Sequence, residues 1–264
     1  MDAAGCAYFL KLVYSAAHRG IFERSFPVVQ HLNDHGIGFI SRIVKTRDGR
    51  LSAFYDGAAA GLFHWIDGEN FETDETKIPE YDMLARVYAV PADGLDIRRE
   101  DFAGSSAGRF FAQWDVLDDP PTRALFERRR DVLECRAGRL RRFAGHCQGD
   151  AAAFYITHGD AGGNLITGGD GRLCIVDWDD PMLAPPERDA WVMCGKPWAK
   201  CVFEKALRRH GISHILRSKW LAYYCYHYFF WYLTEFLNER TDAGIIAGYL
   251  DGWITESLAY ADNQ

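Results

Sequence analysis

The sequence lacks features that mark several classes of protein. Acidic residues outnumber basic ones by 37 to 30, giving a net charge of −7, which argues against a nucleic-acid partner held through phosphate contacts. No apolar run reaches membrane-spanning length without a polar break. The longest candidate, residues 220–236, contains His227, Thr234 and Glu235. The first residues also lack the basic region and the long apolar core of a secretory leader.

Cysteine usage argues against a disulfide scaffold. The seven cysteines include no Cys-x-x-Cys pair, and their number is odd. This pattern predicts reduced thiols in a cytoplasmic protein. A hydrophobic content of 48% and an aromatic content of 14% predict a folded globular chain. Its 264 residues can bury one large core or two smaller lobes.

Basic residues do gather in one segment, residues 122–148, which is predicted to form a single helix. No aromatic residues interleave with the basic ones, as they often do in nucleic-acid sites. We therefore interpret these arginines as a solvated helix face. They are Arg128, Arg129, Arg130, Arg136, Arg139, Arg141 and Arg142. The negative net charge is also compatible with a small cationic substrate.

Polar residues stand at the ends of two apolar runs between Ile156 and Asp189. A Gly-Gly-Asp-Gly turn separates the runs, which favours a β-hairpin. Asp160 and Asn164 precede the first run, and Asp177 and Asp179 end the second. Pairing of the runs would bring these four side chains together at one end of the hairpin. Oxygen ligands of this kind suit Mg²⁺ and phosphate better than Zn²⁺.

This stretch resembles the active site of the aminoglycoside phosphotransferase family, which has a protein-kinase-like fold. Members carry a His-x-Asp loop that ends in Asn, followed by a strand that ends in Asp-x-Asp or Asp-x-Glu. The matching residues are His158-Gly159-Asp160, Asn164 and Ile175-Val176-Asp177-Trp178-Asp179. The continuation, Asp180-Pro181-Met182-Leu183-Ala184-Pro185 with Glu187-Arg188-Asp189, is similar to the spectinomycin phosphotransferase branch.

One feature of the loop departs from the kinase pattern. Asn164 follows Asp160 by four residues, whereas protein kinases place this Asn five residues after the catalytic Asp. Gly162 and Gly163 can let a shortened loop take a tighter path.

The resemblance implies an ATP- and Mg²⁺-dependent O-phosphotransferase that acts on a small hydroxyl-bearing molecule, such as an aminoglycoside-type antibiotic. Asp160 is the implied catalytic residue, and Asn164, Asp177 and Asp179 are the implied metal ligands. Asp189 is implied to brace the catalytic loop through hydrogen bonds. From the residues alone, Asp189 is a helix cap or first-turn acid, and the two roles are compatible.

The N-terminal segment supplies two charged residues to this scheme. Residues 7–14 are predicted to form a strand and residues 20–33 a helix. In the kinase-like fold a strand lysine pairs with a helix glutamate and holds the α- and β-phosphates of the nucleotide. Lys11 and Glu23 take these places by order and spacing. The alternative interpretation is two unrelated surface charges.

Three further strands are predicted at 39–45, 50–55 and 59–66. After the third strand the resemblance implies a passage between lobes, where the backbone of His64, Trp65 and Ile66 hydrogen-bonds adenine. The implied architecture is an α+β, two-lobe fold. Residues 1–68 form a truncated β-sheet lobe, and residues 69–264 form a mainly helical lobe with the catalytic loop and the metal-binding hairpin. Later helices are predicted at 70–90, from Ala190, and at 203–209, 218–237 and 243–260.

The strand at 7–14 has an uncovered side in this scheme. It is apolar on both faces, which predicts a place inside a sheet, yet only ten residues precede Lys11. The family needs two more strands and a glycine loop there. We expect either an incomplete chain or a second copy that covers the edge.

The same feature motivates an alternative function, an N-terminally truncated, catalytically impaired kinase-like binding protein. A weaker alternative is a metal-dependent phosphohydrolase that uses Asp160 and Asp177.

Overall fold

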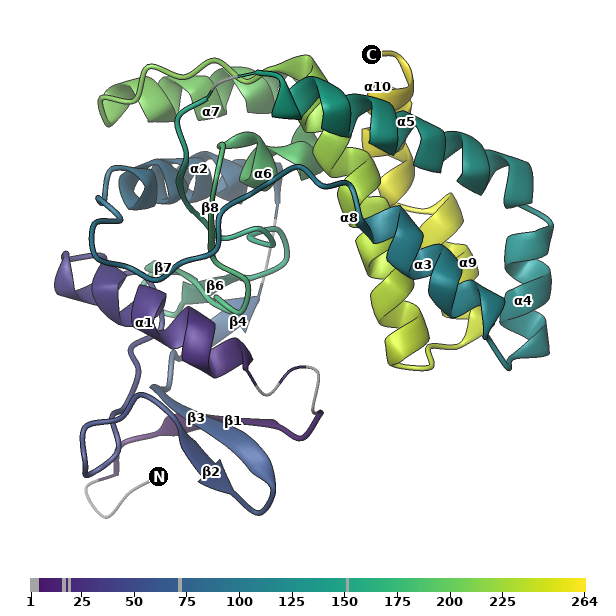
Figure 1. Cartoon of the computed structure of the whole chain (residues 1–264). Coiled ribbons are helices and arrows are strands. Elements are labelled where there is room, and N and C mark those ends of the chain that lie inside the picture. The colour runs from purple at the N-terminus through teal and green to yellow at the C-terminus, as the bar shows by residue number, and fades with distance from the viewer. Residues whose placement is uncertain (1–4, 16–17, 19, 71–72, 151) are drawn as a thin grey trace. The chain divides into compact units, whose positions relative to one another are not determined.

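The computed structural model describes residues 5–15, 18, 20–70, 73–150 and 152–264 (Figure 1). These residues belong to two compact units. The first contains the chain up to Glu100, together with 154–189 and 202–214. The second contains 101–153, 190–201 and 215–264. The lobe boundary expected after residue 68 stays a prediction, because compact units do not by themselves locate a boundary between lobes.

Strands occur in the first unit, in small antiparallel sheets. The sheet orders are β1-β3-β2, β4-β6-β7 and β5-β8. The strands are β1 (Tyr8–Val13), β2 (Ala53–Tyr55), β3 (Ala58–His64), β4 (Gly68–Asn70), β5 (Tyr155–Thr157), β6 (Leu165–Gly168), β7 (Leu173–Ile175) and β8 (Met182–Ala184).

Helices occur in both units, which confirms the predicted α+β class. They are α1 (Ile21–Asp34), α2 (Asp74–Tyr88), α3 (Ser106–Asp115), α4 (Pro120–Glu127), α5 (Arg130–Gln148), α6 (Glu187–Ala190), a 3-10 helix (Trp191–Met193), α7 (Pro197–Arg209), α8 (Ser218–Asn238), α9 (Ala243–Asp251) and α10 (Ile254–Asp262). Within the described part of the chain, none of them is long and apolar enough to cross a membrane.

The predicted strand at 7–14 is confirmed as β1, and it lies at the edge of its sheet. The Trp65 N–H donates to the Ala7 carbonyl. Because antiparallel bonding alternates along a strand, Leu10 and Leu12 direct their backbone groups away from β3. No strand pairs with that outer edge among the residues that the structure describes. The side chains of Leu10 and Leu12 are 54% and 37% exposed, so the edge is apolar as well as open.

Helix α1 covers the inner face of this sheet. Phe22 and Phe26 stack at 4.5 Å, and Phe26 also meets Phe63 of β3. Gly61 of β3 leaves room for the Phe26 ring, since a side chain at that position would overlap it. The helix ends before Gly36, which has a φ of +80°, as the predicted stop requires. This packing holds the sheet that carries Lys11 against α1.

The predicted hairpin is confirmed as β6 and β7. Leu165 pairs with Ile175 and Thr167 with Leu173. β4 joins as a third strand, which the sequence did not indicate. The strand predicted at 39–45 is wrong as a regular strand: Ile40 bridges Ile175 of the hairpin, and Ile43 bridges Phe63 of β3. The segment is divided between two sheets, so it forms isolated bridges that link them.

Three helix predictions need correction. The single helix expected at 122–148 is two helices, α4 and α5, which Arg128 and Arg129 separate. The helix expected from Ala190 is only the end of the four-residue α6 and a 3-10 turn. The helix expected at 243–260 breaks at Gly252, where the backbone leaves the helical conformation and a side chain would overlap the Gly248 carbonyl. Sequence periodicity continues across these breaks, because it reports burial and not the backbone angles of one residue.

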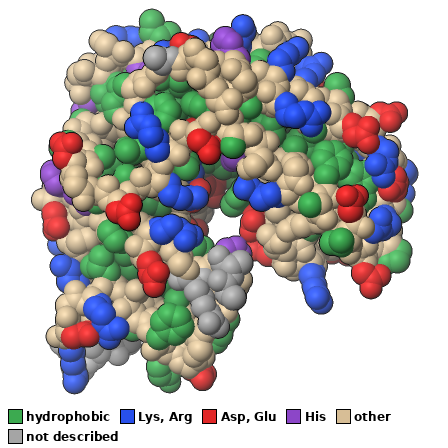
Figure 2. All heavy atoms as spheres, viewed as in Figure 1, with side chains coloured by type: hydrophobic (Ala, Val, Ile, Leu, Met, Phe, Trp, Pro, Cys, Tyr) green, Lys and Arg blue, Asp and Glu red, His purple; other side chains and the backbone are tan. Residues whose placement is uncertain are grey.

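The second unit is helical, and the aromatic helix α8 is its core, as predicted. Trp220, Tyr224 and Phe229 of this helix are fully buried. Arginines of this segment contact carboxylates of the same unit: Arg129, between α4 and α5, pairs with Asp251, and Arg139 of α5 pairs with Asp262. On the face shown in Figure 2, basic and acidic side chains lie interspersed.

Candidate active site

The loop predicted to be catalytic begins directly after β5 with a buried histidine. His158 Nε2 donates to the Val176 carbonyl at 2.9 Å, and its Nδ1 accepts the Asp160 N–H at 3.1 Å. One ring nitrogen donates and the other accepts, so the imidazole is neutral. Burial lowers the pKa of His158, while the charge of Asp189 acts in the opposite direction. The histidine therefore joins the loop to the end of the hairpin as a neutral spacer.

Asp189 braces the same loop, as predicted. One carboxylate oxygen accepts the His158 N–H at 3.1 Å, and the other accepts the Gly159 N–H at 2.5 Å. The Tyr88 hydroxyl donates to this carboxylate at 2.7 Å. Asp189 is 7% exposed, and these three donors satisfy a charge that would otherwise be costly to bury. Asp189 also lies in the first turn of α6.

Asp160 and Asn164 lie at the two ends of the shortened loop. The Asn164 amide nitrogen donates to the Asp160 backbone carbonyl at 2.6 Å, and its side-chain oxygen is the atom left to accept or ligate. Gly163 has a φ of +85°, a conformation that few residues other than glycine adopt. Asn70 donates to the Gly163 carbonyl. A glycine thus lets the loop close in four residues, as the sequence indicated.

Lys11 connects β1 to both carboxylates at the end of the hairpin. Its Nζ lies 2.5 Å from an Asp177 oxygen and 2.6 Å from an Asp179 oxygen. Asp177 adopts a left-handed conformation with a φ of +63°, and the Asp179 N–H bonds back to the Asp177 carbonyl. This tight turn allows two carboxylates, two residues apart, to reach the same ammonium group.

The charges at this point do not balance. Burial opposes the Lys11 charge, but hydrogen bonds and charges from Asp177 and Asp179 outweigh it and raise the pKa of Lys11. Burial and the Asp177 charge raise the pKa of Asp179, although Lys11 opposes this. One ammonium group faces two carboxylates, so the cluster remains short of positive charge.

Lys11 does not pair with Glu23 in the structure, contrary to prediction. Glu23 is exposed, and among the described residues the acidic partners of Lys11 are Asp177 and Asp179. Phe22 and Phe26 take the buried face of α1, which turns Glu23 away from the sheet. Arg24, the next residue, lines a small cavity beside Asp179. A role for Glu23 with bound nucleotide stays a prediction.

A cavity of about 480 Å³ lies beside this cluster, entirely within the first unit. Its walls are mainly apolar, and Lys11, Asn164, Asp177 and Asp179 lie at its polar end. The three residues expected to contact adenine, His64, Trp65 and Ile66, also line it. The His64 and Trp65 N–H groups already donate to the carbonyls of residues 42 and 7. The Ile66 N–H has no protein acceptor within the described ranges, so it is the donor that a ligand can use.

The side chains of Asp177, Asp179 and Asn164 carry the oxygen ligands that a divalent cation such as Mg²⁺ prefers. Lys11 Nζ marks a point on which oxygens of Asp177 and Asp179 converge, and Asn164 lines the same cavity. In the part of the chain that is described, no group of three or more His, Cys, Asp or Glu side chains could hold a metal. Mg²⁺ usually takes one or two carboxylates and completes its shell with water and phosphate oxygens. The metal-ligand assignments stay predictions.

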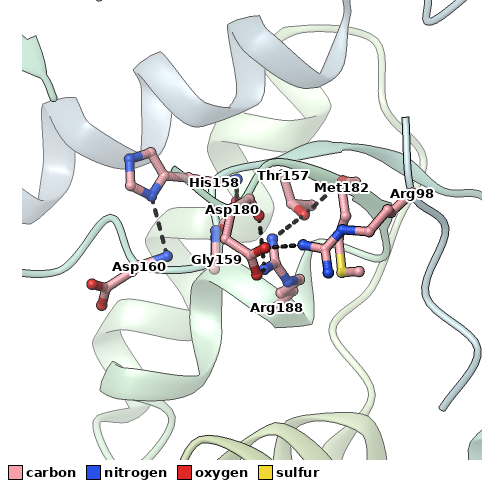
Figure 3. A network of polar contacts seen from close by, with 9 residues as sticks. Arg98, Thr157, His158, Gly159, Asp160, Asp180, Met182 and Arg188 are labelled. Carbon is pink, nitrogen blue, oxygen red and sulfur yellow. Dashed lines mark hydrogen bonds and ion pairs between the residues drawn. The ribbon is translucent and has the colours of Figure 1, made fainter. Parts of the chain in front are cut away.

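Sequence reasoning missed two residues that support the loop, Arg188 and Asp180. Arg188 is 3% exposed and donates to Asp180 and to Thr157, as Figure 3 shows. The available signal is the run Glu187-Arg188-Asp189, because adjacent opposite charges after two prolines are unusual in a segment that is otherwise apolar.

Proteins of known structure share the fold of this chain. A family model described as "Phosphotransferase enzyme family" matches residues 2–251. An AMP-bound spectinomycin phosphotransferase has a similar structure, with a TM-score of 0.74 and 18% identity, over 98% of this chain and 89% of the other. A choline kinase from Streptococcus pneumoniae has a TM-score of 0.65 and 12% identity, over 100% of this chain and 88% of the other. An aminoglycoside phosphotransferase from Alicyclobacillus acidocaldarius has a TM-score of 0.59 and 15% identity, over 99% of this chain and 87% of the other. A comparison with curated protein sequences gives no match.

The His158 imidazole should remain neutral, with its proton on Nε2, to a pH below its ordinary pKa of 6.5. The folded pKa is lowered, so the unfolded chain takes up this proton first as pH falls. The stability that depends on the neutral ring is therefore full above pH 6.5 and is lost as pH falls through the folded pKa. Nitrogen-15 NMR of histidine-labelled protein measures tautomer and titration together, with His158→Gln for assignment. A midpoint above 6.5, or a proton on Nδ1, would contradict this assignment.

Proposed function

Because the chain belongs to the phosphotransferase enzyme family, we propose that it transfers a phosphoryl group from ATP, with Mg²⁺, to a hydroxyl group of a small molecule. The observation that carries the proposal is the meeting of Lys11, Asp177 and Asp179 at the polar end of a cavity of about 480 Å³. Small-molecule and cofactor sites typically have volumes of about 300–1,000 Å³. Phosphoryl transfer needs mostly positioning and charge neutralisation, which these residue types supply.

Each residue has a defined part in this proposal. Asp160 orients the acceptor hydroxyl and takes its proton late in the transfer. Lys11 holds phosphate oxygens, and Asp177, Asp179 and Asn164 hold the metal. When bound, Mg²⁺ supplies the positive charge that the carboxylate cluster lacks and neutralises the phosphate oxygens.

The nucleotide would occupy the cavity, with adenine between its apolar walls. Phe9, Phe63 and Val176 contribute to these walls, and the Ile66 N–H is the donor for a ring nitrogen. Neighbouring structures support a nucleotide and a divalent cation. A spectinomycin phosphotransferase is described in complexes with AMP and with ADP and spectinomycin, and an amicoumacin kinase in a complex with AMP-PNP and Ca²⁺.

The proposed acceptor is a cationic, hydroxyl-bearing molecule such as an aminoglycoside-type antibiotic. The similar structures include spectinomycin and aminoglycoside phosphotransferases and a choline kinase, whose named substrates share a hydroxyl and a cationic nitrogen. The net charge of −7 favours the approach of cations. A panel that contains spectinomycin, aminoglycosides, choline and uncharged sugars tests this choice. Turnover restricted to uncharged sugars would contradict it.

Asp160→Asn should lower kcat by at least about 100-fold and leave the fold intact, because general bases typically contribute that much. Single-turnover phosphorylation of an accepted substrate measures the loss, and circular dichroism checks the fold. Asp170→Asn, in the exposed hairpin turn, is the matched control and should keep its full rate. An Asp160→Asn rate above about a tenth of wild type would remove Asp160 from the base role.

Asp177→Ala should weaken nucleotide binding much more with Mg²⁺ than without it. A ligand carboxylate acts through the metal, so its loss should matter mainly when the metal is present. Isothermal titration calorimetry with an ATP analogue, with and without Mg²⁺, makes this comparison. Equal losses under both conditions would assign Asp177 a structural role.

The open edge of β1 supports a proposal about assembly, in which a second copy of the chain covers it. Leu10 and Leu12 present apolar side chains there, and no described residue pairs with their backbone groups. Such edges pair readily with another strand. Light scattering should show a dimer, and Leu12→Lys should dissociate it. A wild-type monomer at all concentrations would refute this assembly.

The alternative of an impaired binding protein gains support if the dimer binds neither nucleotide nor Mg²⁺.

A further inference from the structure

A buried arginine lies beneath the catalytic loop, next to the aspartate that braces it. The Arg188 side chain is 3% exposed. Nη1 donates to the Thr157 hydroxyl at 3.0 Å, and Nη2 donates to the Asp180 backbone carbonyl at 3.0 Å and to its carboxylate at 2.8 Å. In Figure 3 the guanidinium group lies between these two residues. The planar group therefore holds two separate segments of the chain at once.

The two segments carry the two halves of the active site. Thr157 is the last residue of β5 and stands three residues before Asp160. Asp180 directly follows Asp179 at the end of the hairpin. β8 also pairs with β5, and the Thr157 hydroxyl donates to the Met182 carbonyl at 2.9 Å. Arg188 thus bridges the segment before the proposed base and the segment after the proposed metal ligands.

Gly159 brings the loop backbone against the guanidinium group. It has a φ of +91°, and a side chain built on it would overlap the Arg188 guanidinium atoms. The hydrogen bonds to Thr157 and Asp180 prevent the guanidinium from moving aside. The loop therefore passes so close to Arg188 at Gly159, one residue before Asp160, that no side chain would fit between them.

Stability alone does not account for an arginine at this place. Burying a guanidinium is costly, and the Asp180 carboxylate, which pairs with it at 2.8 Å, is 52% exposed and is shared with Arg98. Apolar residues of similar volume often replace a buried ion pair without loss of stability. A guanidinium differs in its fixed fork of donors, which imposes direction and distance on its acceptors. These properties serve the placement of the two segments.

We propose that Arg188 is a positioning residue, which fixes the catalytic loop with Asp160 relative to the carboxylates of Asp177 and Asp179. It does not line the cavity proposed for the nucleotide, and it acts through Gly159, Thr157 and Asp180. The catalytic consequence rests on the proposed phosphotransferase function, whereas the structural link does not.

The test compares Arg188→Ala and Arg188→Lys with Arg98→Ala as the matched control. Arg98 contacts the same Asp180 carboxylate but is 48% exposed. Both Arg188 variants should lower kcat by about 10- to 100-fold with little change in the KM for ATP, because misplacement of reacting groups affects the rate more than binding. Guanidinium chloride at millimolar concentration should restore part of the Arg188→Ala rate, and sodium chloride should not. Arg98→Ala should keep near-normal kcat without addition. Full kcat in both Arg188 variants, or equal loss with Arg98→Ala and no guanidinium rescue, would overturn the proposal.

A second measurement does not depend on turnover. In Arg188→Ala, hydrogen–deuterium exchange should be faster at the His158 and Gly159 amides, even though Asp189 can still accept a hydrogen bond from each of them. Added guanidinium should slow the exchange at these two amides again. Arg98→Ala should exchange as wild type does. Unchanged exchange in Arg188→Ala, or loss of protection throughout the chain, would overturn the positioning role. If the wild type transfers phosphate to no acceptor, the proposed function fails. The exchange measurement then decides by itself whether Arg188 positions the loop.

Discussion

Two carboxylates that share one ammonium group set the main constraint on this structure. Asp177 and Asp179 reach the same Nζ of Lys11 at 2.5 and 2.6 Å. Like charges this close need a cation between them, and a single lysine leaves one negative charge uncompensated. Burial, and after it the Asp177 charge, raise the pKa of Asp179, and Lys11 only partly opposes them. A bound divalent cation would remove the deficit and release Lys11 for phosphate oxygens, so the same residues can serve two arrangements.

The rest of the first unit holds this cluster in place through buried polar groups. β1 positions Lys11 because α1 packs Phe22 and Phe26 against the sheet. The loop that contains Asp160 is held by hydrogen bonds from the neutral His158 and to Asp189, and Arg188 bonds to Thr157 directly before it. Hydrogen bonds of this kind define geometry more sharply than apolar packing does. A phosphotransferase needs that definition, because its rate depends on the placement of reacting groups.

The sequence was sufficient for the elements that carry a local signal. The glycine turn and the flanking apolar runs identified the β6–β7 hairpin, and the spacing of polar residues identified the loop and both carboxylates. The sequence was insufficient where contacts between residues far apart in the chain determine the structure. Glu23 has the expected spacing from Lys11, but the helix phase set by Phe22 and Phe26 exposes it. β5 and β8 are three residues each and pair through contacts across the loop, so neither carries enough residues for periodicity. Arg188 looks like a surface charge until its partners, Thr157 and Asp180, are brought together by the fold.

The most direct test is a crystal structure of the protein with a non-hydrolysable ATP analogue and Mg²⁺. We expect the metal to lie against the Asp177 carboxylate and Lys11 Nζ to have moved from the carboxylates to phosphate oxygens. We also expect adenine beside the Ile66 N–H in the cavity of the first unit. A complex in which Lys11 still bridges Asp177 and Asp179, with the nucleotide elsewhere or without a metal, would contradict the account.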